Sequence, residues 1–221
     1  SLFFPRLCLL CGELLVDGEK CLCLSCIYKL PRTNYHLRPF NPAEQLFTGK
    51  VEIEKATAFL HYEKGGKVQQ LIYAIKYKGE KEAGFQLGRQ AALALHEKGF
   101  FEGIDMLLPV PLHSQRQKKR GYNQAQILAE EIGKILEIPV DSKSLIRTRK
   151  TSPQKKLGHQ ERKKNLKHAF AVKHTFQAVK RVLLVDDIYT TGNTIDAVSN
   201  VLKQKGVENV YFLTISIGQG Y

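Results

Sequence analysis

Long apolar runs are missing from this chain of 221 residues. No stretch approaches the ~18 consecutive apolar residues that a membrane-spanning helix requires, so we expect no membrane insertion. The opening residues, Ser1 to Pro5, are too short for a signal peptide and have no basic flank before them. We therefore expect a cytoplasmic protein without a leader.

Internal repeats and low-complexity tracts are also missing, and 43% of the residues are apolar, which is typical of a globular protein. The length allows one α/β domain of about 150–190 residues together with a small appendage.

Acidic residues are too few to balance the basic ones: 34 Lys and Arg stand against 21 Asp and Glu, which gives a net charge of +13. Such an excess favours anionic partners, either phosphorylated small molecules or nucleic acid, but a merely solvated basic surface is an equally good explanation. The basic residues form two clusters in segments that we expect to be loops. One contains Arg116, Lys118, Lys119 and Arg120, and the other Lys155, Lys156, Arg162, Lys163 and Lys164.

Cysteine is missing beyond residue 26, since all five cysteines lie within the first 26 residues. Cys8-x₂-Cys11 and Cys23-x₂-Cys26 are two pairs of the kind that place four thiolates around one Zn²⁺. Four thiolates leave no open coordination position, so the predicted zinc is structural, and a segment this small needs it to fold. Disulfides or redox thiols are a weaker alternative in a reducing compartment. Cys21 is left over, either as a bystander or as a replacement for Cys23.

The cysteine pairs predict a zinc finger at 1–31. The prolines and the lack of periodicity at 32–50 predict a linker packed against the next domain, and the main domain is expected at 51–221. Within the main domain we expect strands near 55–62, 106–111, 145–147, 182–187 and 208–216. Helices are expected near 68–78, 80–98, from 124 and from 194. This order fits an α/β fold with a doubly wound parallel sheet and helices on both faces. The basic end of the first helix, Lys76 to Lys78, is expected to be solvated.

One stretch carries the strongest chemical signal. Four aliphatic residues, 182–185, predict a buried parallel strand that ends at Asp186 and Asp187, and a short turn then opens a helix. The turn consists of Thr190, Thr191, Gly192, Asn193 and Thr194. Hydroxyls and free N–H groups at a helix start attract a phosphate, and Gly192 lets the backbone approach it closely. The two acids suit sugar hydroxyls or a phosphate-bound Mg²⁺. The alternative is an ordinary strand–turn–helix unit whose acids cap the helix.

The acidic pair followed by Thr-Thr-Gly-Asn-Thr resembles the phosphoribosyl pyrophosphate (PRPP) motif of type I phosphoribosyltransferases. Together with the cysteine pairs and the string Arg120-Gly121-Tyr122-Asn123-Gln124, it resembles the ComF/ComFC competence family over nearly the whole chain. The resemblance implies the type I phosphoribosyltransferase fold. It also implies that residues 190–194 anchor the 5′-phosphate and that Asp186 and Asp187 act on the ribose in catalysis. The pyrophosphate, held with Mg²⁺, is expected at the amides of Leu112, His113 and Ser114.

A long polar excursion at 148–168 resembles the flexible loop of PRPP enzymes, and within it Thr151, Gln154 and Arg162 are expected to close over the site. A mobile charged linker without a role is the alternative. No general base is evident, because His113 and His159 are near the expected site only in sequence.

The ComF resemblance implies a cytoplasmic role in DNA uptake during natural transformation, acting on single-stranded DNA with a DNA-translocating ATPase. Three functions stay open at this point. The first is phosphoribosyl transfer to an unknown acceptor; the second is a non-catalytic factor that senses PRPP and binds single-stranded DNA through the basic cluster 116–120. The third is a phosphoribosyltransferase of nucleotide metabolism. Aromatic platforms for base stacking are not evident beyond the scattered Tyr35, Tyr122 and Tyr189.

Overall fold

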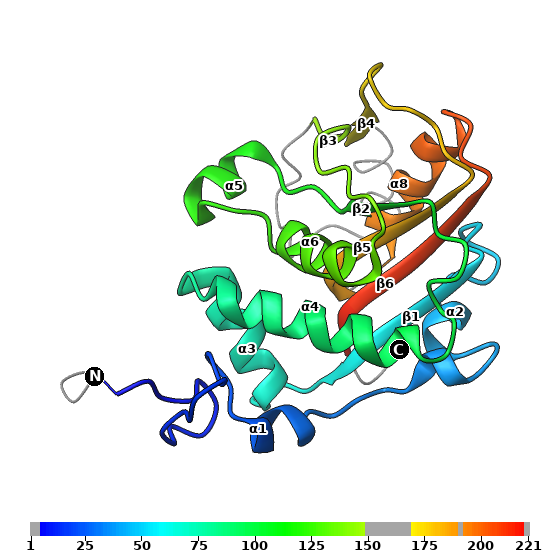
Figure 1. Cartoon of the computed structure of the whole chain (residues 1–221). Coiled ribbons are helices and arrows are strands. Elements are labelled where there is room, and N and C mark those ends of the chain that lie inside the picture. Colours follow the sequence, from blue (N-terminus) through cyan, green and yellow to red (C-terminus); the bar gives the residue numbers. More distant parts are fainter. Residues whose placement is uncertain (1–4, 149–168, 190–191, 219–221) are drawn as a thin grey trace.

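A four-stranded, wholly parallel sheet lies at the centre of the computed structural model, which describes residues 5–148, 169–189 and 192–218 (Figure 1). The strand order is β1 (Lys55–Tyr62), β6 (Asn209–Gly218), β5 (Arg181–Tyr189) and β2 (Met106–Pro109). The predicted doubly wound α/β arrangement is therefore confirmed.

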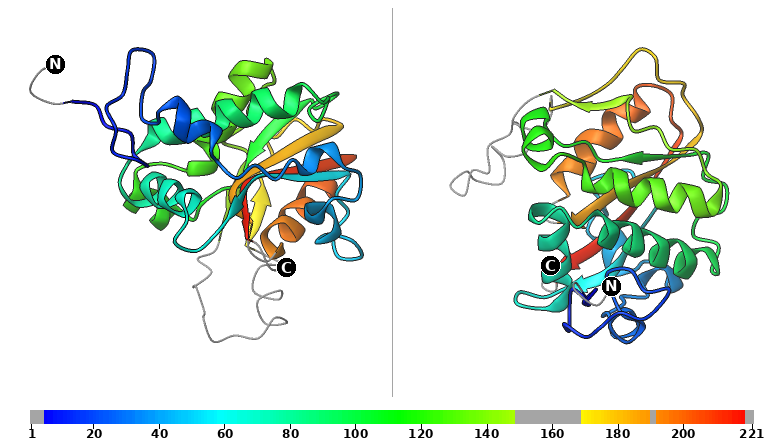
Figure 2. Two further views of the ribbon diagram at one scale, coloured as in Figure 1. Left: turned by 90° about the horizontal axis from the view of Figure 1, so that it is seen from below. Right: turned by 60° about the vertical axis from the view of Figure 1, so that its left-hand side comes forward.

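Helices cover both faces of this sheet, as Figure 2 shows. One face packs against α3 (Lys67–Tyr77), α4 (Lys81–His96) and α6 (Gln124–Leu136), and the other packs against α8 (Asn193–Lys203). Side chains of β5 alternate between the two layers, since Leu183 and Val185 belong to the first core and Val182 and Leu184 to the second. Burial on both faces explains why the strand reads as a continuous apolar run.

The sheet register places the carboxyl ends of three strands side by side, and we call this end of the sheet its carboxyl edge. Pro109 of β2 lies opposite Val185 of β5, and Asp186 lies opposite Thr214 of β6. The chain therefore leaves β2 beside the two acids of β5. In an open parallel sheet this edge is where ligands bind.

Strand β5 is longer than predicted, because it continues through both acids to Tyr189 instead of ending at them. Ile188 and Tyr189 still pair with β6, and the Tyr189 ring packs edge-on against Phe47 at a centroid distance of 5.5 Å. The burial of this ring favours the extension of the strand beyond the polar pair.

Strand β3 (Leu145–Arg147) was expected in the central sheet, and this expectation is wrong. It pairs antiparallel with β4 (Phe170–Val172) in a separate two-stranded sheet. These strands flank the segment 149–168, so Thr151, Gln154 and Arg162 lie outside the described residues.

The first basic cluster lies on a short helix, α5 (Ser114–Arg120), and not in a loop as predicted. His113 caps its start by accepting a hydrogen bond from the amide of Gln115, and Gly121, with φ 81°, ends it. The Gln, Lys and Arg residues between these caps have high helix propensity, which outweighs the mutual repulsion of their charges.

The segment before β1 packs against the main domain, as predicted, but it contains short regular elements: η1 (Tyr35–Leu37) and α2 (Pro42–Gln45). Asn41 caps α2, and its side-chain amide donates to the backbone oxygen of Ala56 in β1. The cysteine-rich segment contains α1 (Leu24–Tyr28) and shares one core with α3 and α4. The domain boundaries at 31 and 50 stay predictions. Within the described ranges, none of the helices combines the length and apolarity needed to cross a bilayer.

Candidate functional site

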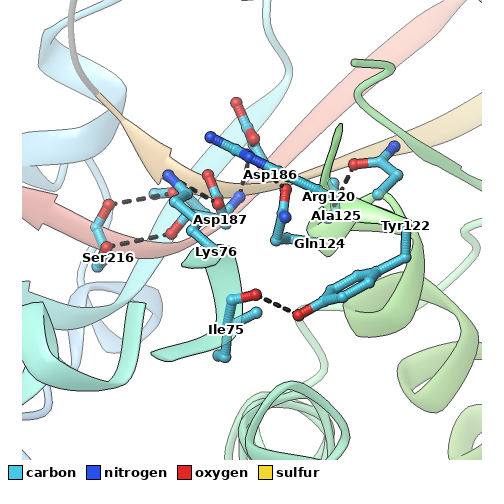
Figure 3. A network of polar contacts seen from close by, with 11 residues as sticks. Ile75, Lys76, Arg120, Tyr122, Gln124, Ala125, Asp186, Asp187 and Ser216 are labelled. Atoms are coloured by element: carbon cyan, nitrogen blue, oxygen red, sulfur yellow. Dashed lines mark hydrogen bonds and ion pairs between the residues drawn. The ribbon is translucent and has the colours of Figure 1, made fainter. Parts of the chain in front are cut away.

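The two acids of β5 lie at the centre of a polar network (Figure 3). Asp187 is 9% exposed, and its Oδ2 lies 2.8 Å from Nζ of Lys76 in α3. Its amide donates to Oδ1 of Asp186 at 2.8 Å, and its backbone oxygen accepts a hydrogen bond of 3.1 Å from the hydroxyl of Ser216 in β6. The orientation of the pair is thus fixed from the two neighbouring elements, α3 and β6.

Burial raises the pKa of Asp186 to about 7, and the charge of Asp187 acts in the same direction. The amide of Asp187 and the positive charges of Lys76 and Arg147 oppose this increase. Such perturbed carboxylates gather at functional sites more often than elsewhere, which supports this edge of the sheet as the candidate site.

Lys76 was expected to be part of a solvated helix end, and this expectation is wrong. Its side chain is only 15% exposed because it turns inward to Asp187. Its place in the last turn of α3 had been attributed to the helix dipole alone. Nothing in the sequence indicates this contact, because Lys76 and Asp187 are far apart in the chain.

Two strings that lie apart in the sequence meet beside the acids. The hydroxyl of Tyr122 donates to the backbone oxygen of Ile75, and the Arg120 guanidinium lies over the Tyr77 ring, 5.2 Å from its centroid. Arg120 also donates to Oε1 of Gln124 at 2.9 Å. The segment 120–122 therefore fixes the end of α3 and, through it, the position of Lys76.

Gln124 and Asn193 are two further polar residues of this region that are almost fully enclosed. Gln124 is 1% exposed and Asn193 is 8% exposed. Among the described residues, Nε2 of Gln124 and Nδ2 of Asn193 have no hydrogen-bond acceptor. An enclosed donor without an acceptor is costly, and a bound ligand is one way to satisfy it. Asn193 was a predicted site residue; Gln124 was quoted only as part of a family string.

The turn after β5 is described from Gly192 onward, and Thr190 and Thr191 lie outside the described residues. Gly192 has φ 72° and precedes α8, and no side chain caps this helix start among the described residues. The helix start therefore presents the amides of Asn193 and Thr194 to the edge of the sheet where the acids lie, which is the arrangement that attracts an anion.

The loop after β2 begins beside the end of β5, because Pro109 pairs with Val185, the residue before the acids. The amide of Val110 donates to the oxygen of Val185, which holds the loop against β5. Within the described part of the chain, the amides of Leu112, His113 and Ser114 donate to no backbone acceptor. They remain candidates for an anion, although His113 already uses its ring nitrogen as a helix cap.

Arg147 in β3 is a charged residue near the acids that was not among the predicted site residues. Burial lowers the pKa of its guanidinium, the charge of Arg116 lowers it further, and the charge of Asp186 raises it. Its guanidinium lies 5.2 Å from the centroid of the Phe170 ring. The β3–β4 pair and the start of α5 thus add positive charge to the site, whereas Lys118 and Lys119 are exposed.

The four paired cysteines cluster as predicted: the sulfur atoms of Cys8, Cys11, Cys23 and Cys26 all lie within 4.8 Å of one another. The sulfurs of Cys11 and Cys23 are 3.7 Å apart, close to the ~3.8 Å edge of a tetrahedron with Zn–S bonds of about 2.3 Å. Burial opposes ionisation of Cys8, but the amides of Cys23, Cys11 and Leu10 lower its pKa to about 6. Burial and the neighbouring thiols raise the pKa of Cys26 to about 12. A cation would allow all four to ionise together, so the donor set fits a metal.

Cys21 lies outside this cluster. Its thiol donates to Oε1 of Gln86 at 3.0 Å, and burial, together with the negative charges of Glu82 and Glu80, raises its pKa to about 12. A protonated, hydrogen-bonded thiol is a poor metal ligand, so the structure selects Cys23 for the cluster.

Comparison with known proteins agrees with this arrangement. The family model described as "Phosphoribosyl transferase domain" matches residues 80–216. "Competence protein F" of Haemophilus influenzae is 40% identical over 145 residues, which is 63% of either chain and thus less than two thirds of that relative. "DNA utilization protein YhgH" of Shigella flexneri is 28% identical over 93% of this chain and 94% of that protein. "Competence protein ComFC" of Bacillus subtilis is 32% identical over 46% of this chain and 39% of its own.

Among solved structures, a hypoxanthine phosphoribosyltransferase from Staphylococcus aureus is similar to this chain, with a TM-score of 0.36 and 13% identity. The match covers 61% of this chain and 62% of that protein, and the similarity is too low to establish the fold. The identity of the fold follows instead from the sheet topology and the family match. The chain belongs to the phosphoribosyl transferase domain family, as a member of its ComF branch.

Proposed function

We propose that this protein binds PRPP at the edge of the sheet formed by the ends of β2 and β5 and the start of α8. The observation that carries the proposal is that Asp186 and Asp187 lie at the end of the strand that leads to α8, whose start is capped by no side chain of the described residues. Carboxylates suit ribose hydroxyls, and free helix amides suit a phosphate.

Each predicted residue has a role in this proposal. Residues 190–194 hold the 5′-phosphate, Asp186 and Asp187 hold the ribose, and the amides of 112–114 hold the pyrophosphate. The carboxylates are the oxygen donors that Mg²⁺ prefers, and Mg²⁺ bound with PRPP would offset the negative charge of the pyrophosphate. Lys76 and Arg147 add fixed positive charge to the same site.

The reaction that fits this site is displacement at C1 of the ribose: the bond from C1 to pyrophosphate breaks as a bond to the acceptor forms. The two carboxylates would stabilise the positive charge that develops on the ribose. Thr151, Gln154 and Arg162, outside the described residues, would exclude water from the closed site. The acceptor and its general base are not assigned.

The similarity to competence proteins supports a role in DNA uptake. Our proposal places this role in the cytoplasmic step of natural transformation, with a DNA-translocating ATPase as a partner. The four-cysteine cluster would hold a structural Zn²⁺.

A second candidate function, binding of single-stranded DNA, is favoured by one surface that the sequence did not reveal. Tyr73 and Tyr77 are 53% and 63% exposed, and their ring centroids are 4.9 Å apart on α3. Arg120 lies over Tyr77, and the exposed Lys118 and Lys119 lie on the same short helix as Arg120. Exposed rings beside positive charges suit stacked bases and their phosphates.

The third candidate, a phosphoribosyltransferase of nucleotide metabolism, requires no DNA binding.

Two sets of variants separate these functions. Replacement of both acids, D186N/D187N, should abolish PRPP binding and any PRPP-dependent release of pyrophosphate. K118E/K119E should weaken oligonucleotide binding and reduce its salt dependence, because fewer counterions are released. Y73A/Y77A should weaken the binding with little change in salt dependence, whereas Y28A, which removes a tyrosine that is 78% exposed on α1, should change neither. If the wild-type protein ignores oligonucleotides at low salt, direct DNA binding is contradicted and the PRPP proposal stands.

A further inference from the structure

The contact between Lys76 and Asp187 removes two charges from water. The two side chains are 15% and 13% exposed, and the charged atoms are 2.8 Å apart. Such an enclosed pair adds little net stability, since the cost of desolvation consumes most of the attraction. Stability alone is therefore a weak reason for a lysine at this position.

The position of Lys76 is set by contacts that come from another part of the chain. Tyr122 donates to the backbone oxygen of Ile75 (Figure 3). Arg120, the last residue of α5, lies over the ring of Tyr77, so the residues on either side of Lys76 are both held by the segment 120–122. The lysine is consequently directed at Asp187 by the fold, and not merely attracted to it from a flexible surface.

The positive charge of Lys76 offsets negative charge that gathers at the acid pair. Asp186 and Asp187 are adjacent, and the charge of Asp187 raises the pKa of Asp186. A sugar phosphate brings several more negative charges to the same edge of the sheet. Without a fixed cation, two carboxylates would repel the ligand that their oxygen atoms are placed to bind.

We propose that Lys76 is a positioning residue of the phosphoribosyl site: its ammonium group holds the Asp187 carboxylate in place and supplies a built-in counter-charge that lets a polyanionic sugar phosphate approach the acid pair. This inference rests on the proposed PRPP site and deepens it. Because the Lys76 ammonium group supplies positive charge at the acids, part of the PRPP affinity does not depend on Mg²⁺.

The test is PRPP affinity measured by calorimetry on the full, metal-replete chain, with Mg²⁺ and again with EDTA at a concentration that spares the cysteine-bound metal. K76M removes the charge, K76Q keeps a hydrogen-bond donor without the charge, and K76R keeps the charge. We expect K76M and K76Q to bind PRPP about tenfold more weakly or worse, and K76R to stay within a few-fold of wild type. The loss should be larger in EDTA, since added Mg²⁺ replaces part of the missing charge.

The matched control is K78M, which removes an exposed lysine two positions away, at the cap of the same helix. It should bind PRPP like the wild type under both conditions. Thermal unfolding of every variant shows whether the affinity refers to folded protein. Should K76M fail to fold, K76Q carries the test.

Wild-type affinity in K76Q overturns the inference and leaves the proposed function intact. Equal losses in K76R and K76Q, unaffected by Mg²⁺, also overturn it, because they indicate a role of side-chain shape and not of charge. If the wild-type protein itself binds no PRPP, the proposed function fails and the inference fails with it.

Discussion

The hydroxyl of Tyr189 lies 2.6 Å from the point where a Cβ atom would stand at residue Gly192. Tyr189 closes β5, and Gly192, with φ 72°, opens α8. A Cβ atom at this position would strain the backbone and displace the Tyr189 hydroxyl, so glycine is strongly favoured. This close contact lies at the turn that we propose to bind the phosphate.

G192A should destabilise the fold by about 1–3 kcal/mol and weaken PRPP binding strongly, because the turn must move away from Tyr189. Thermal unfolding and calorimetry measure the two effects. G206A is the matched control: it has the same kind of left-handed backbone, with φ 93°, but its nearest neighbour is an ordinary contact at 3.7 Å. It should cost stability and leave PRPP affinity unchanged. Equal effects of both variants on affinity would contradict the role of this turn.

Asp186 should cost the protein stability at neutral and alkaline pH. Its pKa in the folded protein is raised from 3.8 to about 7, so ionisation is less favourable in the folded chain than in the unfolded chain. This cost is absent below pH 3.8 and grows as the pH rises to about 7. D186N should therefore raise the free energy of unfolding by roughly 1–3 kcal/mol at pH 8 and much less at pH 4. Chemical denaturation at the two pH values measures this difference. A D186N variant that is less stable than the wild type at pH 8 would contradict the prediction.

Removal of metal from the cysteine cluster should unfold the N-terminal segment. C8S and C26S each remove one of four ligands, so metal content should fall and the melting temperature should decrease. C21S is the control, because Cys21 bonds Gln86 outside the cluster. Elemental analysis and thermal unfolding give the two readings. A protein that contains no zinc when purified under zinc-replete conditions would contradict this assignment.

Loss of the Tyr122 hydroxyl, which holds the end of α3, should weaken the site. Y122F removes the hydrogen bond to the oxygen of Ile75 and leaves the ring, at a cost of about 1 kcal/mol in stability. Because the end of α3 then loses a contact, Lys76 is less well held and PRPP affinity should fall severalfold. Y28F changes an exposed tyrosine and serves as control. Unchanged affinity in folded Y122F would show that α3 needs no such support.

Local pattern was enough to predict the four strands of the central sheet and the helices that cover it, since apolar runs and amphipathic stripes depend on neighbouring residues alone. It wrongly added β3 to that sheet, because strand pairing is not local. It was also enough for the cysteine cluster, where each pair carries its own spacing. It failed at the basic cluster 116–120, where charge suggested a loop but helix propensity and two good caps decided the conformation. It also ended β5 at the acids, because the packing of Tyr189 on Phe47 is not visible in sequence.

The site was only partly predictable for a related reason. Asp186, Asp187 and the turn after them form one continuous string, so their association is local. Lys76 and Arg147 are distant from the acids in the sequence and come near them only in the folded chain. The sequence therefore shows neither the ion pair of Lys76 with Asp187 nor the electrostatic interaction of Arg147 with Asp186. The stacked pair Tyr73 and Tyr77 was predictable in principle, because residues four apart share one face of a helix.

The most direct test of the whole account is calorimetric titration of PRPP with Mg²⁺ into the wild-type protein and into D186N/D187N. The account predicts saturable binding at one site in the wild type and none in the variant, with both proteins folded. Absence of binding in the wild type, or equal binding in the two proteins, would contradict the assignment of a sugar-phosphate site to the end of β5.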